Sequence, residues 1–214
     1  MDSFISPSFD WQKLEDPTIE DMVDVFEDRI KNWLLLPCDY LLRTQHGFVA
    51  TINLLMSYFE GIQVYISGSD SKGASEKFFV DGFLAVFGSH GLSKNQLKGV
   101  AKTMYKEARC GFFHDGMSRG KILYSRGNNN ALLITLPKIN GNIIYDGEID
   151  SVVINPERFL ECVKKHFQSY IDDLRYKRNI NLQNNFKKAV DLKWYLGQEI
   201  KMPFTNEEFR KFGV

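Results

Sequence analysis

Apolar residues recur every three or four positions through most of the chain, which is the spacing of one buried face of an α-helix. The pattern starts after Asp16 and Pro17, which suit the N-cap and the first helical position, and it runs until Pro37. Because proline lacks the N–H that a helix interior needs, we expect the first helix to end there. A second apolar stripe predicts another long helix from about Tyr40 to Ile62.

Two more helical segments follow a linker rich in serine and glycine. The first is short and strongly apolar, and it ends near Gly88. The second begins with Ser93 and Gln96, whose spacing is that of a capping box, and runs to about Cys110. The residue that comes next, Gly111, is a typical helix stop, so we predict that the helix ends there.

Between about residues 120 and 155 the pattern changes. Four short segments rich in β-branched residues are separated by turn residues such as asparagine and glycine, so they predict a small antiparallel meander. Helical spacing returns at Asn155 and again over about 182–200, and Thr205 with Glu208 predicts a capped terminal turn. The predicted fold class is mainly α: a single domain, built as a helical bundle with a small antiparallel β meander inserted before the C-terminal helices.

Composition narrows the class of protein. The 214 residues include 43% hydrophobic side chains and 17 phenylalanines, enough for a core of ordinary size. No apolar run approaches the roughly 20 residues that span a bilayer, and the acidic N-terminus lacks the order of a signal peptide. Cys38, Cys110 and Cys162 are isolated, so they form neither a disulfide framework nor a metal-binding set. We therefore expect a soluble, cytoplasmic protein that uses no membrane, metal or cofactor.

The net charge of zero hides an uneven distribution of charged residues. Residues 1–28 carry nine acidic side chains against one lysine, whereas residues 93–126 carry eight basic side chains against two acidic ones. In the second segment a lysine recurs every four residues, so these side chains form one lysine ribbon along the predicted helix. The ribbon is either a track for a nucleic-acid backbone or the solvated face of an amphipathic helix, and both interpretations remain open. Its members are Lys94, Lys98, Lys102 and Lys106, with Arg109 three residues further on.

The lysine ribbon leads to a segment in which Arg109 and His114 enclose four residues. In an unbroken helix these two side chains would point about 140° apart. They can act on one phosphate only if the helix breaks at Gly111, or if two copies of the segment face each other in a twofold dimer. Cleavage of RNA through its 2′-hydroxyl needs a group that titrates near neutrality and a permanent positive charge at the phosphate. Histidine and arginine supply both without a metal.

An arginine, four residues and a histidine after a helix, in a mainly helical chain of this size, resemble the motif of the HEPN superfamily. The resemblance covers about residues 18–180 and implies a HEPN-like dimer of helical bundles. Many members are metal-independent ribonucleases in RNA processing, toxin–antitoxin pairs or antiviral defence, whereas others are non-catalytic modules that bind nucleotides or proteins. Active members often carry Asn directly after the arginine, where this chain has Cys110.

Two functions therefore stay open. The first is metal-independent cleavage or binding of RNA by a homodimer, for which a cognate antitoxin protein would be a natural partner. The second is a non-catalytic helical module that dimerises or binds a protein or RNA. Under the first, Arg109 is the phosphate clamp and His114 is the acid or base. Lys102 and Lys106 are accessory phosphate contacts. Arg119 is either a further phosphate contact or an ordinary turn residue.

Other interpretations of these residues are less favoured. Cys110 and His114 share a helical face, as a thiol nucleophile and its base would, but a cysteine without a hydrolase signature is more often a small buried hydrophobe. Phe112 and Phe113 would suit stacking on RNA bases, but adjacent phenylalanines after a helix are more often core anchors. Of the other histidines, we expect His46 to cap or pack a helix and His90 to lie in a loop. We expect His166 to lie near a solvated face.

Overall fold

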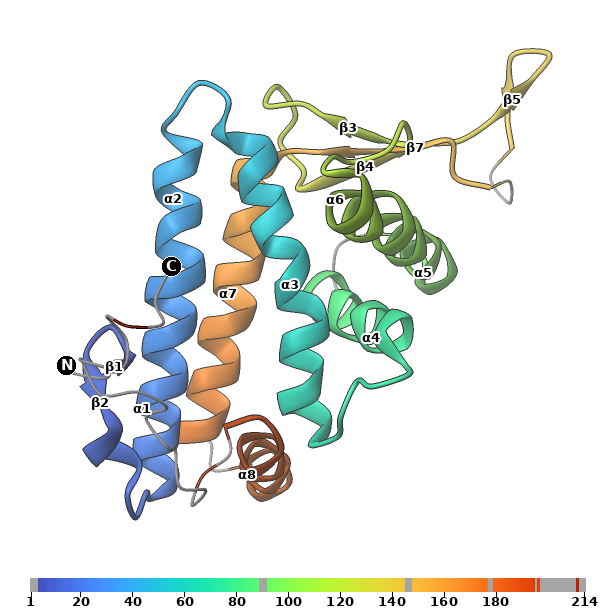
Figure 1. The fold of residues 1–214 in the computed structure, drawn as a ribbon. Coiled ribbons are helices and arrows are strands. Elements are labelled where there is room, and N and C mark those ends of the chain that lie inside the picture. Colours follow the sequence, from blue (N-terminus) through green and yellow to red (C-terminus); the bar gives the residue numbers. More distant parts are fainter. Residues whose placement is uncertain are drawn as a thin grey trace.

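The computed structural model describes residues 4–88, 92–144, 148–176, 179–194, 196 and 211, and they form a mainly helical bundle with a few short strands (Figure 1). The N-terminal elements are β1 (Phe4–Ser6), β2 (Phe9–Asp10), the 3-10 helix η1 (Trp11–Leu14), α1 (Ile19–Arg29), the π-helix η2 (Ile30–Leu35), α2 (Leu36–Leu42), α3 (Gly47–Ser67) and α4 (Ser75–Phe87). The middle elements are α5 (Lys94–Thr103), the π-helix η3 (Met104–Arg109), α6 (Cys110–Asp115), β3 (Ile122–Tyr124), β4 (Leu132–Thr135), β5 (Lys138–Ile139), β6 (Asn142–Ile143) and β7 (Ser151–Ile154). The last helices are α7 (Pro156–Arg175) and α8 (Ile180–Trp194).

The elements α1, η2 and α2 follow one another without a break, so the predicted helix end at Pro37 is wrong (Figure 1). The π-helix η2 ends at Leu35, and Pro37 therefore falls in the first turn of α2. In a continuous rod a proline removes one main-chain hydrogen bond and its ring crowds the preceding turn, and here that turn is the wider π-helix η2. This first rod ends at Leu42, so the second long helix begins at Gly47, later than predicted.

The start of the first rod also differs from the prediction. Thr18, not Asp16, is the N-cap of α1. Its hydroxyl accepts a hydrogen bond from the main-chain N–H of Asp21, and the Asp21 carboxylate accepts one from the N–H of Thr18. This reciprocal capping box satisfies two helix-end donors at once, which a cap at Asp16 would not.

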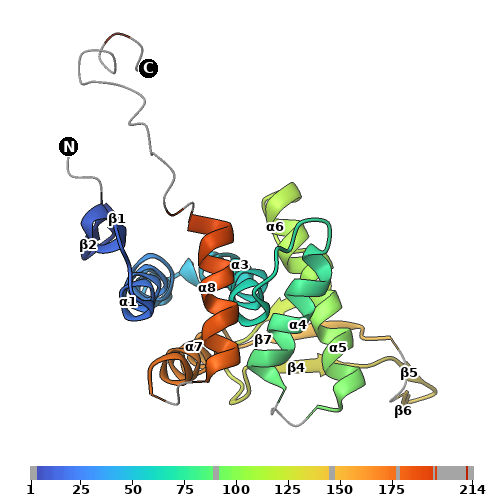
Figure 2. The ribbon, with the colours of Figure 1, turned by 90° about the horizontal axis from the view of Figure 1, so that it is seen from below.

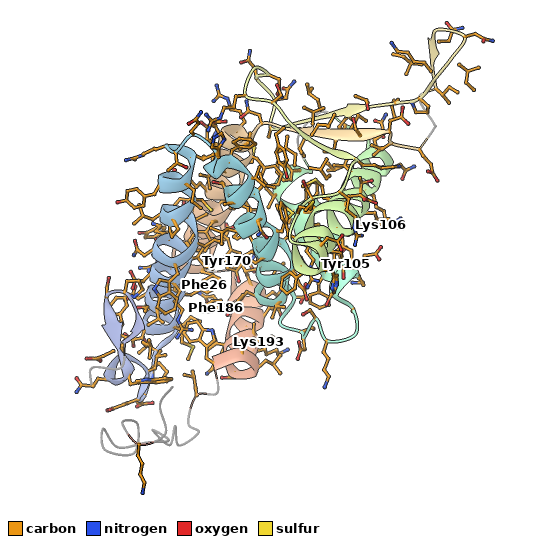
Figure 3. The ribbon with its side chains drawn as sticks, turned by 45° about the horizontal axis from the view of Figure 1, so that its top comes forward. Phe26, Tyr105, Lys106, Tyr170, Phe186 and Lys193 are labelled. Carbon is orange, nitrogen blue, oxygen red and sulfur yellow. The ribbon has the colours of Figure 1, made fainter. Side chains whose placement is uncertain are left out.

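Phenylalanine rings fill the core between the helices. The Phe59 ring of α3 lies 5.1 Å from that of Phe83 and 5.7 Å from that of Phe159, measured between centroids. At another part of the core, the Phe26 ring lies 5.4 Å from that of Phe186 (Figure 3). α4 approaches α3 closely at Gly82, where a Cβ atom would stand 2.0 Å from the main-chain oxygen of Phe59. These contacts join α3, α4 and α7 into one packed unit (Figures 1 and 2).

A second rod is formed by α5, η3 and α6. The capping box at Ser93 and Gln96 begins it, as predicted. The predicted end at Gly111 is wrong, because the helix continues to Asp115 and stops at Gly116, whose φ of 73° is left-handed. The glycine at 111 serves packing instead: a Cβ atom there would stand 2.6 Å from the main-chain oxygen of Met117.

The strands between α6 and α7 lie where the β segment was predicted, but they do not form an antiparallel meander. β7 is the central strand of a three-stranded sheet, parallel to β3 and antiparallel to β4. Both of its edges are paired, and the face that carries Val152 and Ile154 is completely buried. β5 and β6 form a separate hairpin that projects from the bundle (Figure 1).

The C-terminal helices follow the sequence signals. Asn155 caps α7, as predicted, and accepts a hydrogen bond from the N–H of Arg158. α8 corresponds to the helix expected over 182–200 and is described to Trp194. Apart from residue 196, the remainder of that range lies outside the described residues, as do the turn expected at 205–208 and His90.

Candidate functional site

Arg109 is the last residue of η3, and it is held by three side chains. Its Nη2 atom lies 3.3 Å from a carboxylate oxygen of Glu60 on α3. Its guanidinium carbon lies 4.7 Å from the ring centroid of Phe113 and 5.5 Å from that of Tyr105. The Arg109 side chain is 23% exposed, so one part of the guanidinium is engaged and another part is open to a ligand.

The open side of Arg109 faces a small cavity of about 290 Å³ between α3 and the second rod. Glu60 and Phe113 line the same cavity, and so does Lys193 of α8. Lys193 is engaged, since its Nζ lies 2.6 Å from a carboxylate oxygen of Asp70. Glu60 therefore offsets part of the attraction that Arg109 would have for an anionic group in this cavity.

His114 lies in the last turn of α6 and is exposed. Because α6 is helical from Cys110 through Asp115, His114 and Arg109 leave the rod in different directions. A single chain consequently does not bring the two predicted site residues together through a break at Gly111. Of the two arrangements that the sequence analysis allowed, only a twofold dimer could still bring Arg109 and His114 together.

Phe113 and Met117 flank His114 in the sequence and are strongly exposed, by 73% and 64% respectively. Phe112 is buried, so the two adjacent phenylalanines divide between a core anchor and a surface side chain. Cys110 is partly buried. Phe113, His114 and Met117 are thus three exposed residues at the end of the second rod, and we call them the patch at its end.

Arg119 fastens the loop after α6 to the second rod. Its Nε donates to a carboxylate oxygen of Asp115 at 2.6 Å, and its Nη1 donates to the main-chain oxygen of Lys106 at 3.1 Å. The hydrogen bond from Arg119 holds the pKa of Asp115 below its usual value, and the same bond raises the pKa of Arg119. These bonds fit the turn role that the sequence offered for Arg119, and its role in binding a substrate stays a prediction.

The four lysines of the lysine ribbon are exposed, as both interpretations of it require. Lys102 and Lys106 line a cavity of about 790 Å³ between the second rod and the stretch that leads into β7 (Lys106 is labelled in Figure 3). We call this the basic cavity. Lys121, which directly precedes β3, lines it as well.

Two residues at these sites were missed by sequence reasoning. Glu60 had a detectable signal, because it is the only charged residue among the 21 of α3, and an isolated carboxylate in an apolar helix is expected to have a partner. Lys121 had none, since its place in the basic cavity depends on how the β segment packs against the rod.

The two other histidines that the structure describes differ in their surroundings. His46 is exposed and precedes α3. His166 was expected near a solvated face, and it follows the exposed Lys165 but is itself partly buried. Its Nδ1 atom lies 2.8 Å from the hydroxyl of Tyr58, and burial lowers its pKa. Within the described part of the chain, no three His, Cys, Asp or Glu side chains gather to hold a metal ion.

Comparisons of the chain with models of protein families, with curated proteins and with solved structures give no match. Within the residues described by the structure, no helix is both long enough and apolar enough to cross a membrane.

Proposed function

We propose that this protein is a cytoplasmic, metal-independent endoribonuclease of HEPN-like type that acts as a homodimer. The observation that carries the proposal is the patch at the end of the second rod, where exposed His114 is flanked by the exposed apolar side chains of Phe113 and Met117. Exposed apolar side chains at this end of the rod would favour association through it, because a contact would remove them from water. A twofold contact through the patch would form two equivalent crevices, each with Arg109 of one chain and His114 of the other.

The chemistry follows from the two side chains. Arg109 of one chain would hold the scissile phosphate, with its charge opposing the charge that develops in the transition state. His114 of the partner chain would remove the proton of the 2′-hydroxyl or protonate the leaving oxygen. DNA lacks the 2′-hydroxyl, so the reaction would be selective for RNA.

A second candidate is a non-catalytic dimerisation or binding module. The contact between Arg109 and Glu60 favours it, because this ion pair partly neutralises the guanidinium that the reaction would need. If the nuclease proposal holds, the resemblance to HEPN proteins suggests a toxin or defence role, and a cognate antitoxin protein would cover the patch around His114.

The test is cleavage of single-stranded RNA in the presence of EDTA. We expect the wild-type protein to cleave, and His114→Ala to lose at least about 100-fold in rate, which is the usual contribution of a general acid or base. His46→Ala is the matched control, because it removes another exposed histidine far along the chain. Undiminished cleavage by His114→Ala, or no cleavage of any RNA by the wild type, would favour the binding module.

A further inference from the structure

The basic cavity lies between two walls, one formed by the second rod and the other by the β segment. Lys102 and Lys106 lie about one helical turn apart on the second rod. Lys121 lines the cavity from the β segment, and its Nζ donates a hydrogen bond to the main-chain oxygen of Ile149 at 3.0 Å. This bond fixes the ammonium group at the cavity and leaves two further donors for a ligand.

The cavity also contains groups that accept hydrogen bonds. Glu107, whose side chain is 14% exposed, has a carboxylate oxygen 3.8 Å from the Nζ of Lys106, and Glu148 lines the opposite wall. A simple anion would gain little from these carboxylates. A ligand that combines a phosphate with amino or hydroxyl groups would use both kinds of side chain. The apolar part of the wall, suited to the face of a base, consists of Gly99, Leu136 and Ile149.

Size and position favour one unit of a chain over a free small molecule. A volume of about 790 Å³ is ample for a nucleotide. The exposed Lys94 and Lys98 lie beside the cavity on the first turns of α5, where Ser93, Gln96 and Gly99 line it. In the other direction, the rod leads from Lys106 to His114 over about 12 Å. A phosphate backbone that follows the rod would pass the cavity and reach the patch at its end.

We infer that the basic cavity binds a nucleotide of single-stranded RNA that flanks the bond to be cut. Lys102, Lys106 and Lys121 contact its phosphates, and the base lies against the apolar wall. The β segment is then part of the substrate-binding surface. The inference deepens the proposed function and rests on it for the identity of the substrate.

The test measures binding separately from cleavage. A single-stranded 2′-O-methyl oligoribonucleotide, which has no free 2′-hydroxyl to attack the phosphate, is titrated by fluorescence anisotropy over a series of salt concentrations. Lys121→Gln is the test variant, since glutamine keeps an N–H donor for the Ile149 oxygen. Lys138→Gln is its control, because Lys138 is an exposed lysine of the same β segment that does not line the basic cavity.

We expect Lys121→Gln to weaken binding by about tenfold, the usual effect of losing a charge-assisted contact. The slope of log affinity against log salt should fall by about 0.7, which is the loss of one phosphate contact to a single strand. Lys138→Gln should leave both quantities unchanged. Thermal melting of both variants shows whether they keep the fold.

Three results would overturn the inference. These are equal effects of both substitutions, absence of oligonucleotide binding by the wild type, and binding of a free nucleoside monophosphate with none of the oligonucleotide. The proposed function fails separately. If cleavage needs His114 but Lys121→Gln binds as well as the wild type, only the cavity inference is wrong. If binding depends on Lys121 but no RNA is cleaved, only the nuclease proposal is wrong.

Discussion

At the scale of single residues, Glu60 competes with any anionic ligand for Arg109. The two side chains form an ion pair at 3.3 Å, with exposures of 23% and 19%. Glu60→Gln would remove the carboxylate charge that competes with a phosphate for the guanidinium. A partly exposed pair contributes up to about 1 kcal/mol, so binding of the uncleavable oligonucleotide should tighten by about two- to fivefold.

The control for this variant is Glu161→Gln. Glu161 pairs with Arg158 on α7 at 2.9 Å, so its replacement releases an arginine in the same way but outside both cavities. Binding that weakens in Glu60→Gln would show that the carboxylate positions Arg109 for the substrate, and the idea of competition would then be abandoned.

A second prediction at this scale concerns His166 and pH. Burial lowers the pKa of His166 below its ordinary value of 6.5, so the unfolded chain takes up a proton at a pH where the folded protein does not. The contribution of neutral His166 to the free energy of unfolding is therefore fully present above about pH 6.5. It is lost as the pH falls from there through the lowered pKa of the folded state. His166→Gln keeps a polar partner for Tyr58 and removes this titration.

The measurement is the melting temperature between about pH 5 and pH 7. We expect a smaller loss of stability with acidification in His166→Gln than in the wild type. His46→Gln, which removes an exposed histidine, should keep the wild-type profile. Identical profiles for all three proteins would mean that His166 is protonated in the folded state as readily as in the unfolded one.

At the scale of elements, two glycines on neighbouring helices should respond in opposite ways to alanine. A Cβ atom at Gly82 of α4 would collide with the main-chain oxygen of Phe59, whereas one at Gly61 of α3 would meet nothing within 4 Å. We expect Gly82→Ala to cost about 2 kcal/mol and lower the melting temperature by roughly 4–8 °C. Gly61→Ala should raise stability by up to about 1 kcal/mol, since alanine is the better helix former.

Thermal melting of both variants checks this pair. Gly82→Ala with an unchanged melting temperature would contradict the close approach of α4 to α3. Because both changes add the same methyl group to a helix, a difference in sign can come only from the space around each glycine.

The same elements show what the sequence could and could not predict. Caps are local, so Ser93 and Asn155 were recognised from a few neighbouring residues. The π-helices η2 and η3 were not, because a widened turn depends on packing against other helices. Gly111 predicts a helix end by its residue type, although its real constraint is a main-chain oxygen six residues further on. Strand order failed for a similar reason, because the central place of β7 depends on partners distant in the chain.

At the scale of the whole molecule, the candidate site is incomplete in one chain. The second rod is helical through Arg109 and His114, so these side chains diverge, while Phe113 and Met117 remain exposed beside them. If the site forms between two chains, Arg109 of one should serve with His114 of the other. Loss of either residue in both chains should then abolish cleavage.

Mixing the two inactive variants tests this arrangement. In a heterodimer of Arg109→Ala and His114→Ala, one crevice has both intact side chains and the other has neither. Co-expression in equal amounts makes about half of all dimers mixed, so the preparation should recover about a quarter of wild-type activity. Light scattering verifies that dimers form, and Phe113→Asp, which puts a charge into the patch at the end of the second rod, should abolish both dimer and recovery. Mixed dimers without activity would show that each site draws its arginine and histidine from the same chain, and a shared crevice would then be excluded.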